Sequence, residues 1–102
     1  MSNVLHADSQ KLNEYISEND VVFVDFYANW CGPCKMLAPS IEKLADEHSE
    51  VKVVKIDVDQ EQALAMQYQV QSIPTLITFK NGQPVSRQLG FIPYEALEEM
   101  IR

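Results

Sequence analysis

The order of hydrophobic and polar positions divides the chain into strand-like and helix-like segments. Residues 21–27 are a continuous run of β-branched and aromatic side chains broken only by Asp25, and residues 51–58 are a second segment rich in valine and isoleucine. Runs without polar alternation are typical of strands that are buried on both faces, as in parallel or mixed sheets covered by helices. The pattern therefore predicts two central strands. Residues 3–6 are too short for the pattern to decide, and an edge strand through Val4 and Leu5 is a conjecture.

Apolar residues at helical spacing occupy the segments around these strands. They predict four helices, over about residues 9–18, 31–48, 59–68 and 93–101. Pro39 should kink the second helix after its first turn, because proline removes a backbone hydrogen bond there. Asp59 and Gln62 have the spacing of a capping box at the start of the third helix. Met36 and Met66, on the second and third helices, are expected in the core.

Two further strands, joined by a hairpin, complete the predicted sheet. Residues 75–79 and 84–89 flank Asn81 and Gly82, the pair that most strongly favours a hairpin turn. Pro84 cannot donate a hydrogen bond to a neighbouring strand, so the returning strand is expected at or near an edge. The order of elements predicts the α/β class. We expect a central mixed β-sheet, with parallel strands plus a C-terminal antiparallel hairpin, flanked by helices on both faces.

Composition and charge narrow the class of protein. The 102 residues are 46% hydrophobic and carry a net charge of −7, which is typical of one soluble domain, residues 1–102, with its own core. Basic residues form no patch, so we expect no nucleic-acid partner. No apolar stretch approaches the roughly 18 residues that a membrane span needs, and the N-terminal segment lacks the regions of a signal peptide. We therefore expect a cytoplasmic protein with no membrane partner.

The only two cysteines, Cys31 and Cys34, follow the first central strand and lie at the start of the longest predicted helix. Residues three apart on a helical turn have Cβ atoms about 5–6 Å apart, and a disulfide needs Cα atoms roughly 5.5–6 Å apart. The pair can therefore open and close a disulfide with little backbone movement. A bridge across so short a loop contributes only about 2 kcal/mol, against about 3 kcal/mol for a 15-residue loop. A redox switch is thus favoured over a structural crosslink.

The start of a helix also favours a thiolate. Free backbone N–H groups and the positive end of the helix dipole stabilise negative charge there, and the thiolate is the species that attacks a disulfide. Pro33 suits the first helical position, where an N–H would be unpaired anyway, and Gly32 has no side chain to block Cys31. The alternative is half of a zinc site, but zinc needs about four ligands, and His6 and His48 lack ligand spacing. We expect no metal.

Residues 24–35, Val-Asp-Phe-Tyr-Ala-Asn-Trp-Cys-Gly-Pro-Cys-Lys, closely resemble the active-site segment of thioredoxins. The resemblance extends over essentially the whole chain. Further matching positions are Pro39, Lys55, Ile73-Pro74-Thr75, Lys80-Asn81-Gly82 and Gly90. Tyr27 departs from the family's pattern, which usually has a second tryptophan there, and the bulkier Phe91 follows Gly90. Neither departure removes a reacting atom, so both bear on the choice of partner rather than on the chemistry.

The resemblance implies a thioredoxin-like fold and a thiol–disulfide oxidoreductase that reduces protein disulfides. Cys31 would be the nucleophile and Cys34 the resolving residue, in agreement with the place of Cys31 at the helix tip. Asp25 would transfer a proton, and burial in an apolar strand should raise its pKa. The alternative is a buried acid satisfied by hydrogen bonds or by Lys55. Lys55 is either a partner of Asp25 or a solvated lysine with a buried stem.

The same resemblance implies a substrate-binding surface around the cysteines. Its residues would be Trp30, Gly32, Pro33, Ile73, Pro74 and Gly90. Ile73-Pro74 matches the family's cis-proline loop, although a trans bond is far commoner among X–Pro bonds in general. Trp30 would supply apolar contact, or be an indifferent surface residue. Gly90 would allow close approach of a substrate backbone, or adopt a positive φ at a strand end, or both.

The implied partners are a thioredoxin reductase as electron donor and disulfide-containing proteins as substrates. No cofactor is expected besides the redox-active disulfide, and the resemblance implies a monomer. Two other functions stay open: an oxidant or isomerase of the disulfide-isomerase type, which would differ in reduction potential, and a binding module on the same fold. The Gly-Pro between the cysteines and the lack of a signal peptide favour the reductant, and intact Cys31 and Cys34 argue against the binding module.

Overall fold

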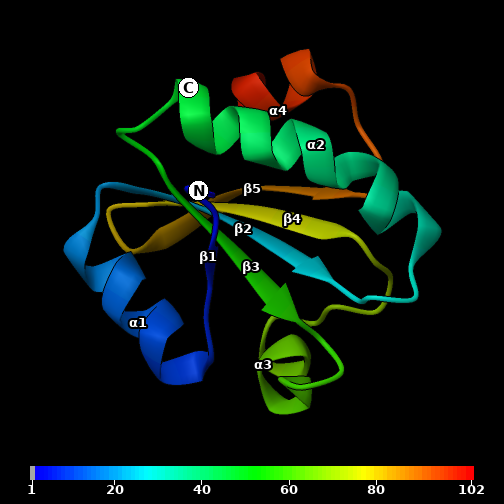
Figure 1. The fold of residues 1–102 in the computed structure, drawn as a ribbon. Coiled ribbons are helices and arrows are strands. Elements are labelled where there is room, and N and C mark those ends of the chain that lie inside the picture. Colours follow the sequence, from blue (N-terminus) through cyan, green and yellow to red (C-terminus); the bar gives the residue numbers. More distant parts are fainter. Residues whose placement is uncertain (1) are drawn as a thin grey trace.

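A computed structural model describes residues 2–102 and confirms the predicted fold class, with a five-stranded mixed sheet between two layers of helices (Figure 1). The strands are β1 (Leu5–His6), β2 (Val21–Tyr27), β3 (Lys52–Asp57), β4 (Thr75–Lys80) and β5 (Gln83–Leu89). The helices are α1 (Ser9–Glu18), α2 (Gly32–Glu47), α3 (Gln62–Gln67) and α4 (Tyr94–Met100).

The central strand of the sheet is β2, because the strand order is β1-β3-β2-β4-β5. β1, β3 and β2 are parallel, whereas β4 is antiparallel to both β2 and β5. The interior of β2 is buried, as its continuous apolar run predicted. β5 lies at the edge, as Pro84 predicted, and Asn81 and Gly82 take positive φ angles of 51° and 85° in the hairpin turn.

Two hydrophobic clusters, one on each face of the sheet, hold the layers together. Phe23 of β2 lies in the cluster under α2 and α4, with Leu37 and Leu97. The next residue, Val24, lies in the other cluster, with Leu12 of α1. Side chains alternate between faces along a strand, so the odd-numbered residues of β2 lie beneath α2.

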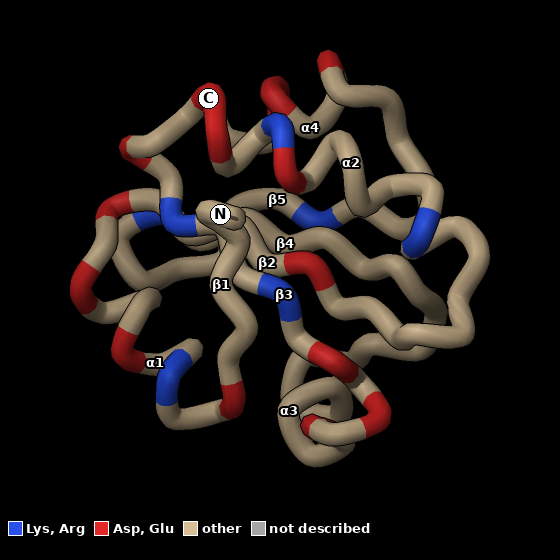
Figure 2. The backbone as a smooth tube through the Cα atoms, viewed as in Figure 1, with Lys and Arg blue, Asp and Glu red and all other residues tan. Residues whose placement is uncertain are grey.

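Charge is spread over the molecule rather than concentrated. Acidic positions lie on helices and loops on both sides of the sheet, and basic positions are scattered among them (Figure 2). Within residues 2–102, no helix combines the length and the apolar character that crossing a membrane requires.

The predicted capping box between Asp59 and Gln62 is wrong. α3 begins at Gln62 itself, and its N-cap residue, Glu61, makes no side-chain cap hydrogen bond. The carboxylate of Asp57 instead accepts hydrogen bonds from the backbone N–H groups of Asp59 at 2.9 Å and Gln60 at 3.4 Å. The chain therefore leaves β3 through a turn that an aspartate stabilises, and the Asp59 side chain has a different partner, described below.

Met36 and Met66 were expected in the core but are 67% and 78% exposed. The buried residues of α2 are Cys34, Leu37, Ile41, Leu44 and Ala45. Their helical spacing leaves Met36 on the outer face. α3 has only six residues, too few for periodicity to decide which face is buried.

Pro33 also differs from expectation: it is the second residue of α2, which begins at Gly32.

Candidate active site

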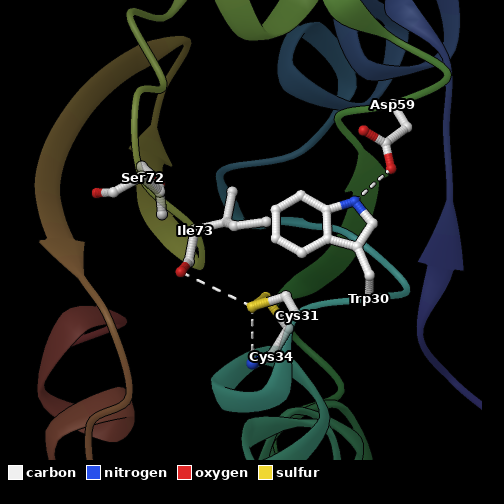
Figure 3. Close-up of a disulfide and its surroundings, with 7 residues drawn as sticks. Trp30, Cys31, Cys34, Asp59, Ser72 and Ile73 are labelled. Carbon is white, nitrogen blue, oxygen red and sulfur yellow. Dashed lines mark hydrogen bonds between the residues drawn. A yellow bond between two sulfur atoms is a disulfide. The ribbon is translucent and has the colours of Figure 1, made fainter.

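Cys31 and Cys34 form a disulfide at the point where β2 leads into α2 (Figure 3). Their Cα atoms are 5.2 Å apart, which confirms that the spacing suits a reversible bridge. Cys31 is the N-cap residue of α2, and its Sγ accepts the backbone N–H of Cys34 at 3.2 Å. The sulfur thus occupies the place of an N-cap oxygen, at the positive end of the helix dipole.

Both cysteines are largely covered, each with 4% of its surface exposed. Exposure therefore does not distinguish one sulfur from the other, whereas their positions relative to the end of α2 differ. Gly32 and Pro33, between the two cysteines, are exposed. No atom lies within 4 Å of the place where a Cβ of Gly32 would be, so the space around Gly32 is open.

Trp30 forms one side of the site and is 69% exposed, as expected (Figure 3). Its indole Nε1 donates a hydrogen bond to the carboxylate of Asp59 at 2.8 Å. This bond orients the indole beside Cys31. Asp59 is the one member of this arrangement that the sequence did not indicate, because the two residues are 29 positions apart and no local pattern joins them.

The segment before β4 forms the other side. The Ile73-Pro74 peptide bond is cis, as the resemblance implied, and the Ile73 carbonyl oxygen lies 3.8 Å from Sγ of Cys31. The backbone N–H of Gly90 donates to the Pro74 carbonyl at 2.8 Å. Gly90 has a φ of +81° with open space where its Cβ would lie, so the backbone conformation, not crowding, favours glycine there.

Asp25 lies on β2 beneath α2, two residues beyond Phe23 in the direction of the cysteines. It is 1% exposed, and neither carboxylate oxygen accepts a hydrogen bond from residues 2–102. Burial raises the pKa of Asp25 to about 7, and the positive charge of Lys55 opposes part of that rise. The carboxyl group therefore changes its protonation state near neutral pH.

Lys55 lies directly across from Asp25, on β3. Its Nζ is 4.2 Å from the centre of the Tyr27 ring, a cation–π contact. Among the described residues, no ion pair within 4.0 Å joins Lys55 to Asp25. The strand register thus places Lys55 beside Asp25. The ammonium group of Lys55, however, lies against the ring of Tyr27, the residue at which this chain differs from the family's pattern.

One group of side chains in residues 2–102 has the arrangement of potential metal ligands, and it does not include the cysteines. Glu47, His48 and Glu98 have ligand atoms within 4.8 Å of one another. They lie where the C-terminus of α2 meets α4, at the opposite end of α2 from the disulfide.

Comparisons with known proteins identify the family. A family model described as thioredoxin matches residues 3–102. The chain belongs to the thioredoxin family. It is thereby a thiol–disulfide oxidoreductase that reduces protein disulfides through Cys31 and Cys34.

Two similar thioredoxins come from bacteria. One from Staphylococcus aureus is 52% identical over 85 residues, which cover 82% of each chain. One from Mycoplasmoides gallisepticum is 44% identical over 96 residues, 94% of this chain and 96% of the relative.

Solved thioredoxin structures share the fold. A mutant thioredoxin from Halobacterium salinarum NRC-1 is 46% identical with a TM-score of 0.90, over 96% of this chain and 87% of that one. Mitochondrial thioredoxin 3 from Saccharomyces cerevisiae, in its oxidised form, is 35% identical with a TM-score of 0.88, over 96% and 92%.

Proposed function

We propose that Cys31 is the nucleophile and Cys34 the resolving residue in the reduction of protein disulfides. The observation that carries this assignment is the N-cap position of Cys31, whose Sγ accepts the Cys34 N–H. In the dithiol form, the same N–H and the helix dipole would stabilise a thiolate at Cys31. Cys34 lies within the first turn, and its sulfur has no such position at the helix end.

The reaction consists of two exchange steps. The Cys31 thiolate attacks one sulfur of the substrate disulfide, which forms a mixed disulfide and releases the other substrate sulfur as a thiolate. Cys34 then loses its proton and attacks Sγ of Cys31. The mixed disulfide breaks, the second substrate thiolate leaves, and the Cys31–Cys34 disulfide forms. Two electrons have then passed from the dithiol to the substrate, whose thiolates take up protons.

Asp25 is proposed to accept the proton that Cys34 loses in the second step. A base is most useful when its pKa lies near the working pH, and burial brings the pKa of Asp25 to about 7. A residue held at such a pKa beside a reactive pair is a candidate for proton transfer on general grounds. Lys55, across from Asp25 on β3, would favour the carboxylate form and so moderate the rise in the pKa.

The substrate is proposed to lie as an extended chain across the exposed surface beside the disulfide. Trp30 would supply apolar contact from one side, and the exposed Gly32 and Pro33 would also contact the substrate. From the other side, the segment of Ile73 and Pro74 would offer its backbone. Gly90, which the positive φ favours at this position, would add no side chain on this side.

The remaining parts of the proposal concern partners and state. The chain would act as a single-domain monomer in the cytoplasm and take its electrons from a thioredoxin reductase. It would need no bound cofactor, because the dithiol itself carries both electrons. The family match over residues 3–102 supports one domain.

The test is the reduction of insulin disulfides by this protein, driven by NADPH and a thioredoxin reductase, with gel filtration to measure its mass. We expect turnover, loss of turnover in the Cys31→Ser variant, and elution as a monomer. A reduction potential far more oxidising than that of glutathione would instead favour the oxidant or isomerase. Full biological activity after replacement of both cysteines by serine would favour the binding module.

A further inference from the structure

The segment that carries residues 73–74 to the disulfide begins at the C-terminus of α3. Gln69 has a positive φ of 56° there. Its N–H donates to the carbonyl of Met66 at 3.0 Å, and the Val70 N–H donates to the carbonyl of Ala65 at 2.8 Å. These two bonds define a Schellman helix end, which favours glycine at its left-handed position. Gln69 carries a Cβ at that position, which the conformation disfavours.

Arg87 of β5 contacts this helix end from the neighbouring strand. Its Nη1 donates to the carbonyl of Tyr68 at 2.7 Å, and its Nη2 donates to the carbonyl of Gln69 at 2.8 Å. Arg87 pairs with Ile77 of β4, and Ile77 lies in the cluster on the α3 side of the sheet. Paired residues point to the same face, so Arg87 leaves the sheet on the side of α3. Carbonyls at a helix C-terminus lack helical partners and bind cationic donors well.

The far end of the same segment is tied to the chain that follows β5. The Gly90 N–H donates to the Pro74 carbonyl at 2.8 Å. Residues 70–73 therefore lie between two anchors, the guanidinium of Arg87 on β5 at their start and the N–H of Gly90, directly after β5, at their end. Within this span, the Ile73 carbonyl oxygen lies 3.8 Å from Sγ of Cys31.

From these contacts we infer that Arg87 is a positioning residue for disulfide reduction, because it holds residues 70–73 in place beside the disulfide. It contacts neither sulfur; it acts through the two carbonyls at the start of the segment. The inference rests on the proposed role of Ile73 and Pro74 in substrate binding. Without the guanidinium, the Schellman end with Gln69 should open more often, and the substrate would have to order the segment when it binds. The cost should therefore fall on KM rather than on kcat.

The test compares two variants that each remove one guanidinium. Arg87→Gln removes the two hydrogen bonds from the guanidinium to the carbonyls of Tyr68 and Gln69. Arg102→Gln makes the same charge change at an exposed arginine whose side chain, among the described residues, forms a hydrogen bond and ion pair with Glu99 alone, at 3.0 Å. With reductase saturating, we expect Arg87→Gln to raise the KM for insulin about tenfold, which corresponds to about 1.4 kcal/mol. Its kcat and its rate of reduction by dithiothreitol should match those of the wild type, and Arg102→Gln should change none of these quantities.

A second substitution separates positioning from general stability. Gln69→Gly removes the disfavoured Cβ at a φ of 56°, so the helix end can form without the guanidinium. Adding Gln69→Gly to Arg87→Gln should lower the raised KM most of the way back to the wild-type value. The conservative Arg87→Lys, which can reach one carbonyl but not clamp both, should give an intermediate KM and serves if Arg87→Gln folds poorly.

Several results would overturn the inference. Arg87→Gln could keep the wild-type KM, or lose kcat without a change in KM. Arg102→Gln could raise the KM as much as Arg87→Gln does. Adding Gln69→Gly to Arg87→Gln could also leave the raised KM unchanged. A wild-type protein that fails to reduce insulin would instead sink the proposed function. If the wild type reduces insulin but Arg87→Gln has the same KM as the wild type, only the positioning role of Arg87 is contradicted.

Discussion

Replacing Asp25 by asparagine removes a titrating carboxyl from the middle of the sheet while keeping its size. The wild-type side chain is 1% exposed and accepts no hydrogen bond from the described residues. Burial therefore penalises its charged form, and its pKa rises from an ordinary 3.8 to about 7. Asparagine resembles the neutral acid and has no charged form, so the variant should escape the penalty that ionised Asp25 incurs.

The sign of the pH dependence follows from the direction of this shift. Between the two pKa values, the folded protein keeps a proton that the unfolded chain has lost. The stabilisation from protonated Asp25 is thus complete below the unfolded value and is lost as the pH rises through the folded value of about 7. The loss proceeds at up to about 1.4 kcal/mol per pH unit. The whole shift corresponds to about 4 kcal/mol.

The assay is urea unfolding of the oxidised protein from about pH 4 to about pH 8.5, for the wild type and Asp25→Asn. The variant's advantage in free energy of unfolding should be small at the acid end and grow to about 4 kcal/mol at the alkaline end. Asp20→Asn, the same chemical change at an exposed position, is the control for loss of one carboxylate and should not show this growth. A difference between wild type and Asp25→Asn that stays constant with pH would refute the reasoning, because it would mean that a partner satisfies the carboxylate.

Three other outcomes are expected. Asp25→Asn should slow insulin reduction at neutral pH by at least about tenfold, since a general base commonly contributes more than that; an unchanged rate would leave Asp25 with a structural role alone. Cys34→Ser should accumulate mixed disulfides between Cys31 and substrate proteins, visible on non-reducing gels, and failure to trap any would contradict the order of attack. His48 should make stability depend on pH, because its hydrogen bond to Glu98 is the main cause that raises its pKa above 6.5. That stabilisation is present below pH 6.5 and is lost as the pH rises through the raised pKa. His48→Gln should therefore destabilise more at about pH 5.5 than at about pH 8.5, and equal effects at both would rule the contribution out.

The sequence by itself determined the elements and the reactive pair. The apolar run of residues 21–27 could only be satisfied by burial on both faces, and it forms the central strand β2. Asn81 and Gly82 dictated the hairpin turn, because their backbone readily takes the positive φ angles that it needs. The spacing of Cys31 and Cys34 was enough to predict a reversible bridge. Each of these features is indicated by a pattern of residues that lie close together in the chain.

The tertiary structure alone decided the contacts that surround this pair. Asp59 was expected to cap a helix, yet it binds the indole of Trp30, because the turn after β3 brings the two residues together. Met36 is apolar, but the packing of α2 on the sheet leaves it outside. The bond from Arg87 to the end of α3 joins segments 18 residues apart. Such contacts depend on strand register and on which helix face is buried, and both are settled only when the whole core packs, since no local pattern encodes them.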